Sequence, residues 1–328
     1  MAQFPLIRPR RLRDNPKIRH WIQENHLHVD SLVMPIFVRS GKKIKRAIKT
    51  MPGIFQLSPD EVLKECEALL KANVKSILLF GIPPKKDALA SWASRDDGVV
   101  QEAIGLIKKK FPELLLIADV CLCDYTDHGH CGVIKQEGKT LSIDNDASLE
   151  ILTKIAASLA RAGADVIAPS DMMDGRVSKI RDELDAVGFK HLPILSYAVK
   201  YASSFYGPFR EALESAPRFG DRKGYQMNPA NLREAFREAE QDIEEGADIL
   251  MVKPGLSSLD VIYALRQRCQ LPIAAYQVSG EYAAIRFAAQ KGAFDETAAV
   301  LESWMALRRA GADIIVSYFA RDFAKYLK

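Results

Sequence analysis

The sequence lacks the long apolar run that a membrane-spanning helix needs. Its longest apolar stretches, such as residues 77–80 and 114–118, fall far short of the roughly 20 residues required. It also lacks the apolar core of a secretory signal, which does not follow the N-terminal basic residues Arg8, Arg10, Arg11 and Arg13. We therefore expect no membrane association and a cytoplasmic location.

The sequence has only a small excess of one charge sign, and it contains few cysteines. The 46 basic residues nearly balance the 42 acidic ones, and they form no long basic block, which argues against nucleic-acid binding. Five cysteines are too few, and odd in number, for a disulfide framework. Three of them fall within eleven positions, however, and such local clustering favours a metal site.

A pattern that occurs three times predicts helices that end and feed buried strands. Gly-Ala-Asp stands at residues 163–165, 246–248 and 311–313, each time between a helical pattern and an apolar run. Glycine at a helix end readily takes the left-handed cap conformation. An apolar run without alternation is typical of a parallel strand that is buried on both faces.

Eight such apolar runs predict eight strands, at residues 32–38, 76–80, 114–120, 165–169, 192–197, 248–253, 271–277 and 313–318. Eight strands that alternate with helices indicate an α/β protein of the (β/α)8 or TIM-barrel class, whereas a doubly wound sheet more often has five or six. An open sheet is the alternative. We expect the catalytic barrel over residues 31–328, with residues 1–30 as an N-terminal arm that docks on a partner subunit.

Two connections, residues 121–145 and 199–227, are too long for simple barrel loops, and each follows the C-terminal end of a strand. Chemistry in barrel enzymes lies at this end, so we expect the active site between them. The second connection carries six aromatic residues and the basic residues Arg210, Arg218, Arg222 and Lys223. It is predicted to be a lid that closes over a bound carboxylate.

The first connection holds three thiols and two imidazoles, namely Cys121, Cys123, His128, His130 and Cys131. Three thiolates indicate zinc, and a fourth position left open to water or substrate is typical of a catalytic site. The histidines either complete a closed structural site or hydrogen-bond around the ligands, which we favour. Asp119 is expected to point into the site, and Asp124 to be a solvated loop charge.

Two lysines are predicted at the same barrel mouth. Lys253 ends an apolar strand, and burial favours the neutral amine, which is the form that attacks a carbonyl to make a Schiff base. Lys200 follows the fifth strand, and repulsion between two such amines lowers the pKa of at least one. The alternatives are an anion-binding role for Lys253 and a solvated position for Lys200.

Long motifs relate the sequence to a known family. They occupy residues 119–132, 196–211, 220–229, 251–255, 276–282 and 317–320, and include KYASSFYGPFR at 200–210 and YQVSGEY at 276–282. Together they resemble the porphobilinogen synthase family, also called 5-aminolevulinate dehydratase, over nearly the whole chain. The resemblance implies the condensation of two 5-aminolevulinate molecules to porphobilinogen with loss of two waters, in heme or chlorophyll biosynthesis.

The resemblance also implies roles for individual residues. Lys253 and Lys200 would form imines with the two substrate ketones, and a catalytic zinc would be held by Cys121, Cys123 and Cys131. One substrate carboxylate would bind Arg210, Arg222 and Gln226. The other would bind Ser279 and Tyr318, on the seventh and eighth strands.

Outside the active site, the resemblance implies an activating magnesium at a subunit interface, held with the help of Glu238. It further implies a homo-octamer built through the N-terminal arm, although other assemblies are equally compatible. Two other functions remain open. Another Schiff-base barrel, such as a class I aldolase, would not need three thiols, and a metal-responsive binding protein would show no turnover.

Overall fold

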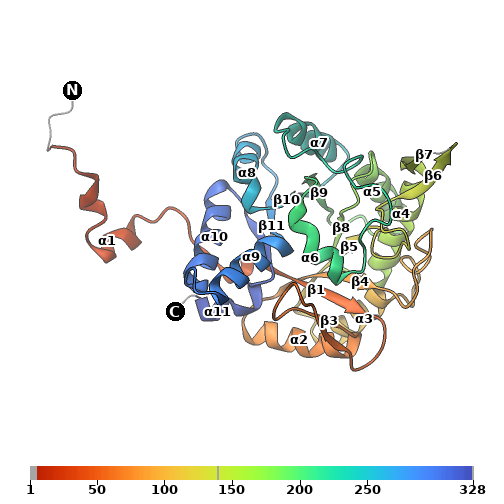
Figure 1. The fold of residues 1–328 in the computed structure, drawn as a ribbon, viewed down its shortest axis with the longest axis horizontal. Helices are drawn as coiled ribbons and strands as arrows, with labels where there is room; N and C mark the ends of the chain where they lie inside the picture. Colours follow the sequence, from red (N-terminus) through yellow and green to blue (C-terminus); the bar gives the residue numbers. More distant parts are fainter. Residues whose placement is uncertain (1–5, 139, 327–328) are drawn as a thin grey trace.

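Eight parallel strands form a barrel in the computed structural model, which describes residues 6–138 and 140–326 (Figure 1). Their hydrogen-bonded order is β8-β5-β4-β1-β12-β11-β10-β9. The barrel strands are β1 (Leu32–Arg39), β4 (Ser76–Ile82), β5 (Leu115–Val120), β8 (Val166–Pro169), β9 (Leu195–Lys200), β10 (Ile249–Lys253), β11 (Ile273–Gln277) and β12 (Ile314–Ser317).

The barrel closes between β8 and the start of β9. Ile167 forms a parallel bridge with Ile194, and its amide donates to the Pro193 carbonyl at 3.1 Å. Closure explains why the strands are largely apolar, because one face lines the barrel interior and the other packs on helices. The predicted (β/α)8 barrel is therefore confirmed, and the open-sheet alternative is wrong.

All eight strands overlap their predicted ranges, but β9 lies further along the chain than expected. The prediction ended this strand at residue 197, whereas Val199 and Lys200 continue it as register partners of Val252 and Lys253 on β10. Lys200 is thus a buried strand residue and not the solvated start of a loop. Pairing with β10 extends β9 as far as Lys200. The prediction stopped earlier because it followed apolar residues, and lysine is not one of them.

Helices surround the barrel and connect its strands. They are α2 (Pro59–Lys71), α3 (Val99–Lys110), α4 (Asn145–Ala162), α5 (Arg176–Ala186), α7 (Arg233–Glu244), α8 (Leu259–Arg266), α9 (Ser279–Gln290), α10 (Glu296–Ala310) and α11 (Phe323–Tyr326). Gly163, Gly246 and Gly311 have φ angles of 105°, 100° and 119° just beyond α4, α7 and α10. The three predicted glycine caps are confirmed. No helix in the described ranges is long and apolar enough to cross a membrane.

Both long connections contain secondary structure. The first carries an antiparallel hairpin of β6 (Val133–Glu137) and β7 (Thr140–Asp144). The second carries the short helices η3 (Ser204–Tyr206) and α6 (Gly207–Ala212). Phe209 of α6 packs on Phe80 and Phe37 of the barrel strands, with ring centroids 5.0 and 5.7 Å apart. This segment therefore covers the mouth of the barrel. Beside it, β2 (Lys45–Ala47) and β3 (Phe55–Leu57) extend the sheet from β1.

The N-terminal segment extends away from the barrel (Figure 1). It contains η1 (Pro9–Leu12), α1 (Pro16–Trp21) and η2 (Val29–Ser31), none of which buries a residue. Trp21 is 83% exposed, and Leu6 and Ile7 are also exposed. Residues 1–5 of the predicted arm and 327–328 of the predicted barrel domain lie outside the described residues.

Candidate active site

Two lysines lie side by side at the mouth of the barrel. Lys253 ends β10 and Lys200 ends β9, and the two are register partners. Side chains at paired positions of neighbouring strands point to the same face of the sheet. Both Nζ atoms lie over the Tyr197 ring, at 5.1 Å for Lys253 and 5.5 Å for Lys200, and the two residues are only 3% and 5% exposed.

Aromatic rings surround the amine of Lys253. Its Nζ lies 4.3 Å from the ring centroid of Tyr276 and 4.7 Å from that of Phe209. Burial, followed by repulsion from Lys200, lowers the pKa of Lys253 to about 7. A substantial fraction of the amine is therefore neutral, and nucleophilic, at physiological pH.

The amine of Lys200 is held by the neighbouring strand. Its Nζ donates to the carbonyl of Ser170, the residue directly after β8. Asp119 on β5 faces the same space, as the sequence predicts, and its buried Oδ1 has no hydrogen-bond partner within the described ranges. Burial, reinforced by Asp124, raises the pKa of Asp119 to about 8.

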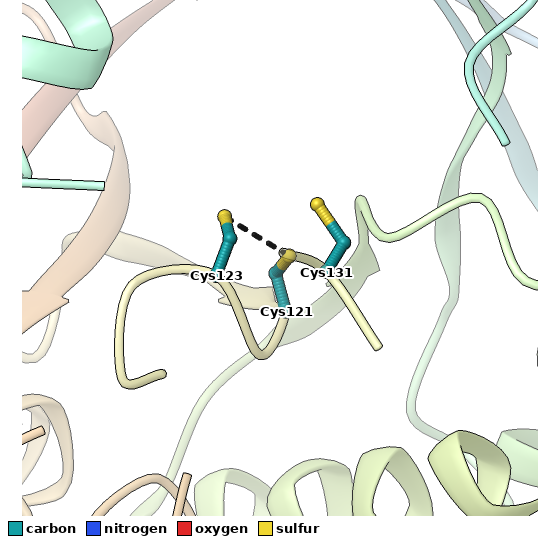
Figure 2. A group of neighbouring side chains, drawn as sticks. All are labelled: Cys121, Cys123 and Cys131. Carbon is teal, nitrogen blue, oxygen red and sulfur yellow. Dashed lines mark hydrogen bonds between the residues drawn. The ribbon is translucent and has the colours of Figure 1, made fainter. Parts of the chain in front are cut away.

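Three thiols converge in the loop after β5 (Figure 2), close enough to Lys200 and Lys253 to interact with their charges. Cys121 directly follows β5, and its Sγ lies 3.3 Å from that of Cys123; with Cys131, all three sulfurs lie within 4.8 Å of one another. Burial raises the pKa of Cys121, whereas hydrogen bonds from Cys121 and Cys123 lower the pKa of Cys131. Three buried, converging sulfurs fit a zinc ion by donor type and number.

Asp124 lies next to this cluster and is not the solvated loop charge that the sequence predicts. It is only 2% exposed, and its Oδ1 lies 3.2 Å from Cys123 Sγ. The loop folds back into the barrel mouth and takes the carboxylate with it. Burial raises the pKa of Asp124.

The two histidines have partners other than the sulfurs. His130 pairs with the Phe219 carbonyl through Nε2 at 3.0 Å and with the Tyr225 hydroxyl through Nδ1 at 3.1 Å. His128 accepts from the His130 amide through Nδ1 and pairs with the Ala88 carbonyl through Nε2. Since all four ring nitrogens are engaged, this arrangement favours the expected supporting role over a closed four-ligand site.

The connection above the mouth brings Arg210, Arg222 and Gln226 together as buried or half-buried polar side chains. The Nε atoms of both arginines and both polar atoms of the Gln226 side chain are buried without a partner among the residues described. Native proteins rarely leave buried polar atoms unpaired. Burial, together with repulsion from Arg222, lowers the pKa of Arg210. This cationic lining is therefore suited to an anionic group.

Ser279 and Tyr318 lie just past strands seven and eight and not on them. β11 ends at Gln277, where the predicted strand also ends, and β12 ends at Ser317, one residue earlier than predicted. Ser279 opens α9, where its Oγ accepts from the Phe209 amide at 3.0 Å and lies 3.2 Å from the Phe205 carbonyl. Tyr318 follows β12, and its hydroxyl lies 3.1 Å from that of Tyr276. Ser279 thus contacts the segment over the mouth.

Glu238 lies apart from the lysines, on α7. It is half-buried and lines a cavity of about 300 Å³ together with Asp174 and Glu234. Burial is the main cause that raises the pKa of Glu238, and the nearby carboxylates add to it. These carboxylates face one space, but within the described ranges they do not converge as the three sulfurs do.

Several residues of the site escape sequence reasoning. Tyr197 and Tyr276 pack against the lysines, but within apolar runs they read as ordinary core residues. Ser170 acts through its backbone carbonyl, for which no side-chain signal exists. The buried Glu281 had a signal, because an acidic residue in the first turn of a helix commonly caps it.

Comparison with known proteins agrees with this geometry. The family model for delta-aminolevulinic acid dehydratase matches residues 6–326. The chain is 52% identical over 320 residues to the delta-aminolevulinic acid dehydratase of Halalkalibacterium halodurans. The aligned region covers 98% of this chain and 96% of the relative. It is 49% identical over 325 residues to that of Synechocystis sp., covering 99% of each.

A solved structure is similar in three dimensions as well. It is the crystal structure of delta-aminolevulinic acid dehydratase (porphobilinogen synthase) from Toxoplasma gondii ME49 in complex with the reaction product porphobilinogen. The TM-score is 0.94 at 47% identity, with 98% of this chain and 91% of that chain covered. With its barrel, paired lysines and cysteine cluster, the chain belongs to the delta-aminolevulinic acid dehydratase family and is a lyase.

Proposed function

We propose that this enzyme condenses two molecules of 5-aminolevulinate to porphobilinogen with loss of two waters, an early step of tetrapyrrole biosynthesis. The pairing of two buried lysines beside a three-thiol cluster carries the proposal, since a reaction that joins two ketones has a use for two amines. The Toxoplasma relative, whose structure contains porphobilinogen, supports the same product.

Lys253 acts as a nucleophile towards one substrate. Its neutral amine attacks the ketone carbon, a C=N bond forms, and the carbonyl oxygen leaves as water. Because the pKa of Lys253 is about 7, a substantial fraction of its amine is neutral at physiological pH. Lys200, its register partner, is placed to form the second imine. Holding both substrates in this way replaces a bimolecular encounter by effective molarities of ~10⁵ M or more.

Charged and polar side chains orient the two substrates. Arg210, Arg222 and Gln226 bind one carboxylate, a role supported by their unpartnered buried donors. Ser279 and Tyr318 bind the other at the ends of β11 and β12. The segment that follows β9, residues 201–227, serves as the lid, since its aromatic residues keep water from the imines.

Cys121, Cys123 and Cys131 hold a catalytic zinc in this proposal. The convergence of their buried sulfurs supports it. When bound, zinc supplies Lewis acidity and lowers the pKa of a coordinated water. The charges of Lys200 and Lys253 interact with the cysteine sulfurs, which supports a zinc role in the same reaction. His130 anchors the loop to the lid through Phe219 and Tyr225.

The remaining expectations are also proposals. Glu238, with carboxylates nearby, helps to hold an activating magnesium, an ion that prefers oxygen ligands and keeps several waters. The arm of residues 1–30, with exposed apolar side chains such as Trp21, docks on other subunits of a homo-octamer. A cytoplasmic location stays a prediction.

Colorimetric detection of a pyrrole tests the proposal. Purified protein with zinc and 5-aminolevulinate is expected to give porphobilinogen, and a Lys253→Met variant is expected to give none. Aldol cleavage of a sugar phosphate without pyrrole formation would favour the aldolase alternative. Zinc binding without any turnover would favour a metal-responsive binding protein.

A further inference from the structure

A buried carboxylate links two parts of the active site that are far apart in sequence. Glu281 lies in the first turn of α9 and is 5% exposed. Its Oε2 accepts from the Val278 amide at 2.7 Å, at the start of its own helix. Its Oε1 accepts from the Leu256 amide at 2.8 Å and the Ser257 amide at 3.4 Å, in the turn after β10.

The turn after β10 directly follows Lys253, the last residue of that strand. Gly255 is held to the neighbouring strand, because its amide donates to the Tyr276 carbonyl at 2.7 Å. A Cβ atom at Gly255 would lie 3.0 Å from that carbonyl, so the two backbones are in close contact. Tyr276 in turn packs on the amine of Lys253. Glu281 and Tyr276 therefore fix the backbone directly after the reactive lysine.

The other segment that Glu281 contacts is the start of its own helix, α9, where Ser279 lies two residues before Glu281. Ser279 Oγ contacts the backbone of Phe205 and Phe209 in the lid. The residue at the helix start, Val278, has no side-chain oxygen with which to cap α9, so the Glu281 carboxylate supplies the cap. A carboxylate with only a capping role would be exposed and would contact only its own helix. Glu281 is buried and contacts a second segment.

We propose that Glu281 is a positioning residue that holds the Lys253 turn and the Ser279 helix start in one fixed relation, so that imine formation and carboxylate binding depend on each other. This inference rests on the proposed roles of Lys253 and Ser279 and adds the group that couples them. A carboxylate suits the task because it is an acceptor only, with two oxygens for N–H groups from two segments.

The test compares Glu281→Gln with wild type and with Glu302→Gln, a control on the exposed side of α10. Glutamine keeps the shape, but its amide nitrogen cannot accept a hydrogen bond. Zinc-loaded enzyme at pH 8.5 is treated with 5-aminolevulinate and borohydride, and adducts on Lys253 and Lys200 are quantified in the same sample. Hydrogen exchange of residues 255–258 is measured in parallel.

In Glu281→Gln we expect the ratio of Lys253 to Lys200 adducts to fall by about tenfold to a hundredfold, the range for a misplaced reacting group. We also expect faster hydrogen exchange at residues 255–258 and a higher KM. General destabilisation would lower both adducts together. If the glutamine variant fails to fold, Glu281→Asp replaces it, since the shorter carboxylate caps Val278 but does not reach Leu256.

An unchanged adduct ratio in a folded variant would overturn the coupling, as would equal hydrogen exchange at residues 255–258. Failure of the proposed function gives a different result. In that case wild type itself would carry no adduct on Lys253, which would remove the basis of both proposals.

Discussion

Arg222 of the lid donates from Nη2 to the carbonyl of Gly129 in the cysteine loop, at 2.8 Å. The same atom donates to the Ser215 carbonyl at 2.7 Å, so one guanidinium joins the lid to the loop that carries the three thiols. The proposed site for one substrate carboxylate and the proposed zinc site are therefore parts of one connected structure. Displacement of the lid would disturb both.

Replacement of Arg222 by alanine should lower kcat/KM strongly. The loss of a charge-assisted contact that leaves its partner buried costs about 2 to 5 kcal/mol, which corresponds to roughly thirtyfold or more in kcat/KM. Steady-state kinetics measure the effect. Lys223→Ala is the control, because this neighbouring side chain is 78% exposed. Equal kcat/KM values for the two variants would remove Arg222 from the carboxylate clamp.

Removal of one thiol should abolish zinc binding and activity together. Cys123→Ala is expected to lose the zinc that wild type binds at about one ion per chain, as measured by elemental analysis, because two thiolates no longer complete the site. A chelator should inactivate wild type, and added zinc should restore it. Cys269→Ala, with its thiol in another part of the core, should keep its zinc. Full activity of metal-free protein would contradict the zinc site.

Borohydride trapping on Lys253 should weaken as the pH falls. The pKa of Lys253 in the folded protein, about 7, lies below the ordinary value of 10.5. The neutral, reactive amine is therefore abundant above pH 7 and falls to roughly a tenth at pH 6. Trapping with 5-aminolevulinate, located by peptide mass analysis, should follow this fraction. Electrostatic binding of an anion would strengthen at low pH, and adducts on other lysines alone would refute the assignment.

Of two glycine substitutions, one should lower kcat/KM and the other should raise the stability of the fold. A Cβ atom at Gly280 would lie 2.5 Å from the Phe205 carbonyl oxygen, so Gly280→Ala should displace the lid and lower kcat/KM. Gly105, within α3, has no atom within 4 Å of such a Cβ, and Gly105→Ala should stabilise the fold by about 0.5 to 1 kcal/mol. Thermal unfolding and kinetics of both variants check this. Normal kinetics of Gly280→Ala would show that the lid contact is dispensable.

Glu238→Ala should lose the stimulation by millimolar magnesium that we expect of wild type. The carboxylate lines a cavity with Asp174 and Glu234, and neither Lys200 nor Lys253 lines that cavity, so activity without magnesium should change little. Glu240→Ala, on the exposed side of the same helix, is the matched control. Equal magnesium responses of the two variants would show that Glu238 does not hold the ion.

The sequence was sufficient to predict the barrel, because parallel strands buried on both faces leave unbroken apolar runs. The buried position of Lys253 at a strand end is predictable for a related reason, since a charged residue at the end of such a run is unusual. The position of Lys200 was harder to predict, because strand pairing with β10 continues through residues that have no apolar pattern. The burial of Asp124 was missed, since it depends on how a loop folds back in space.

The side-by-side placement of Lys200 and Lys253 also bears on the stability of the enzyme. Transfer of an amine from water to an apolar interior opposes folding, and two adjacent amines oppose it further. Methionine at position 253 would fill similar space without this cost, so the inert variant should melt at a higher temperature than the active enzyme. The barrel thus tolerates local instability at the point where the proposed imine forms.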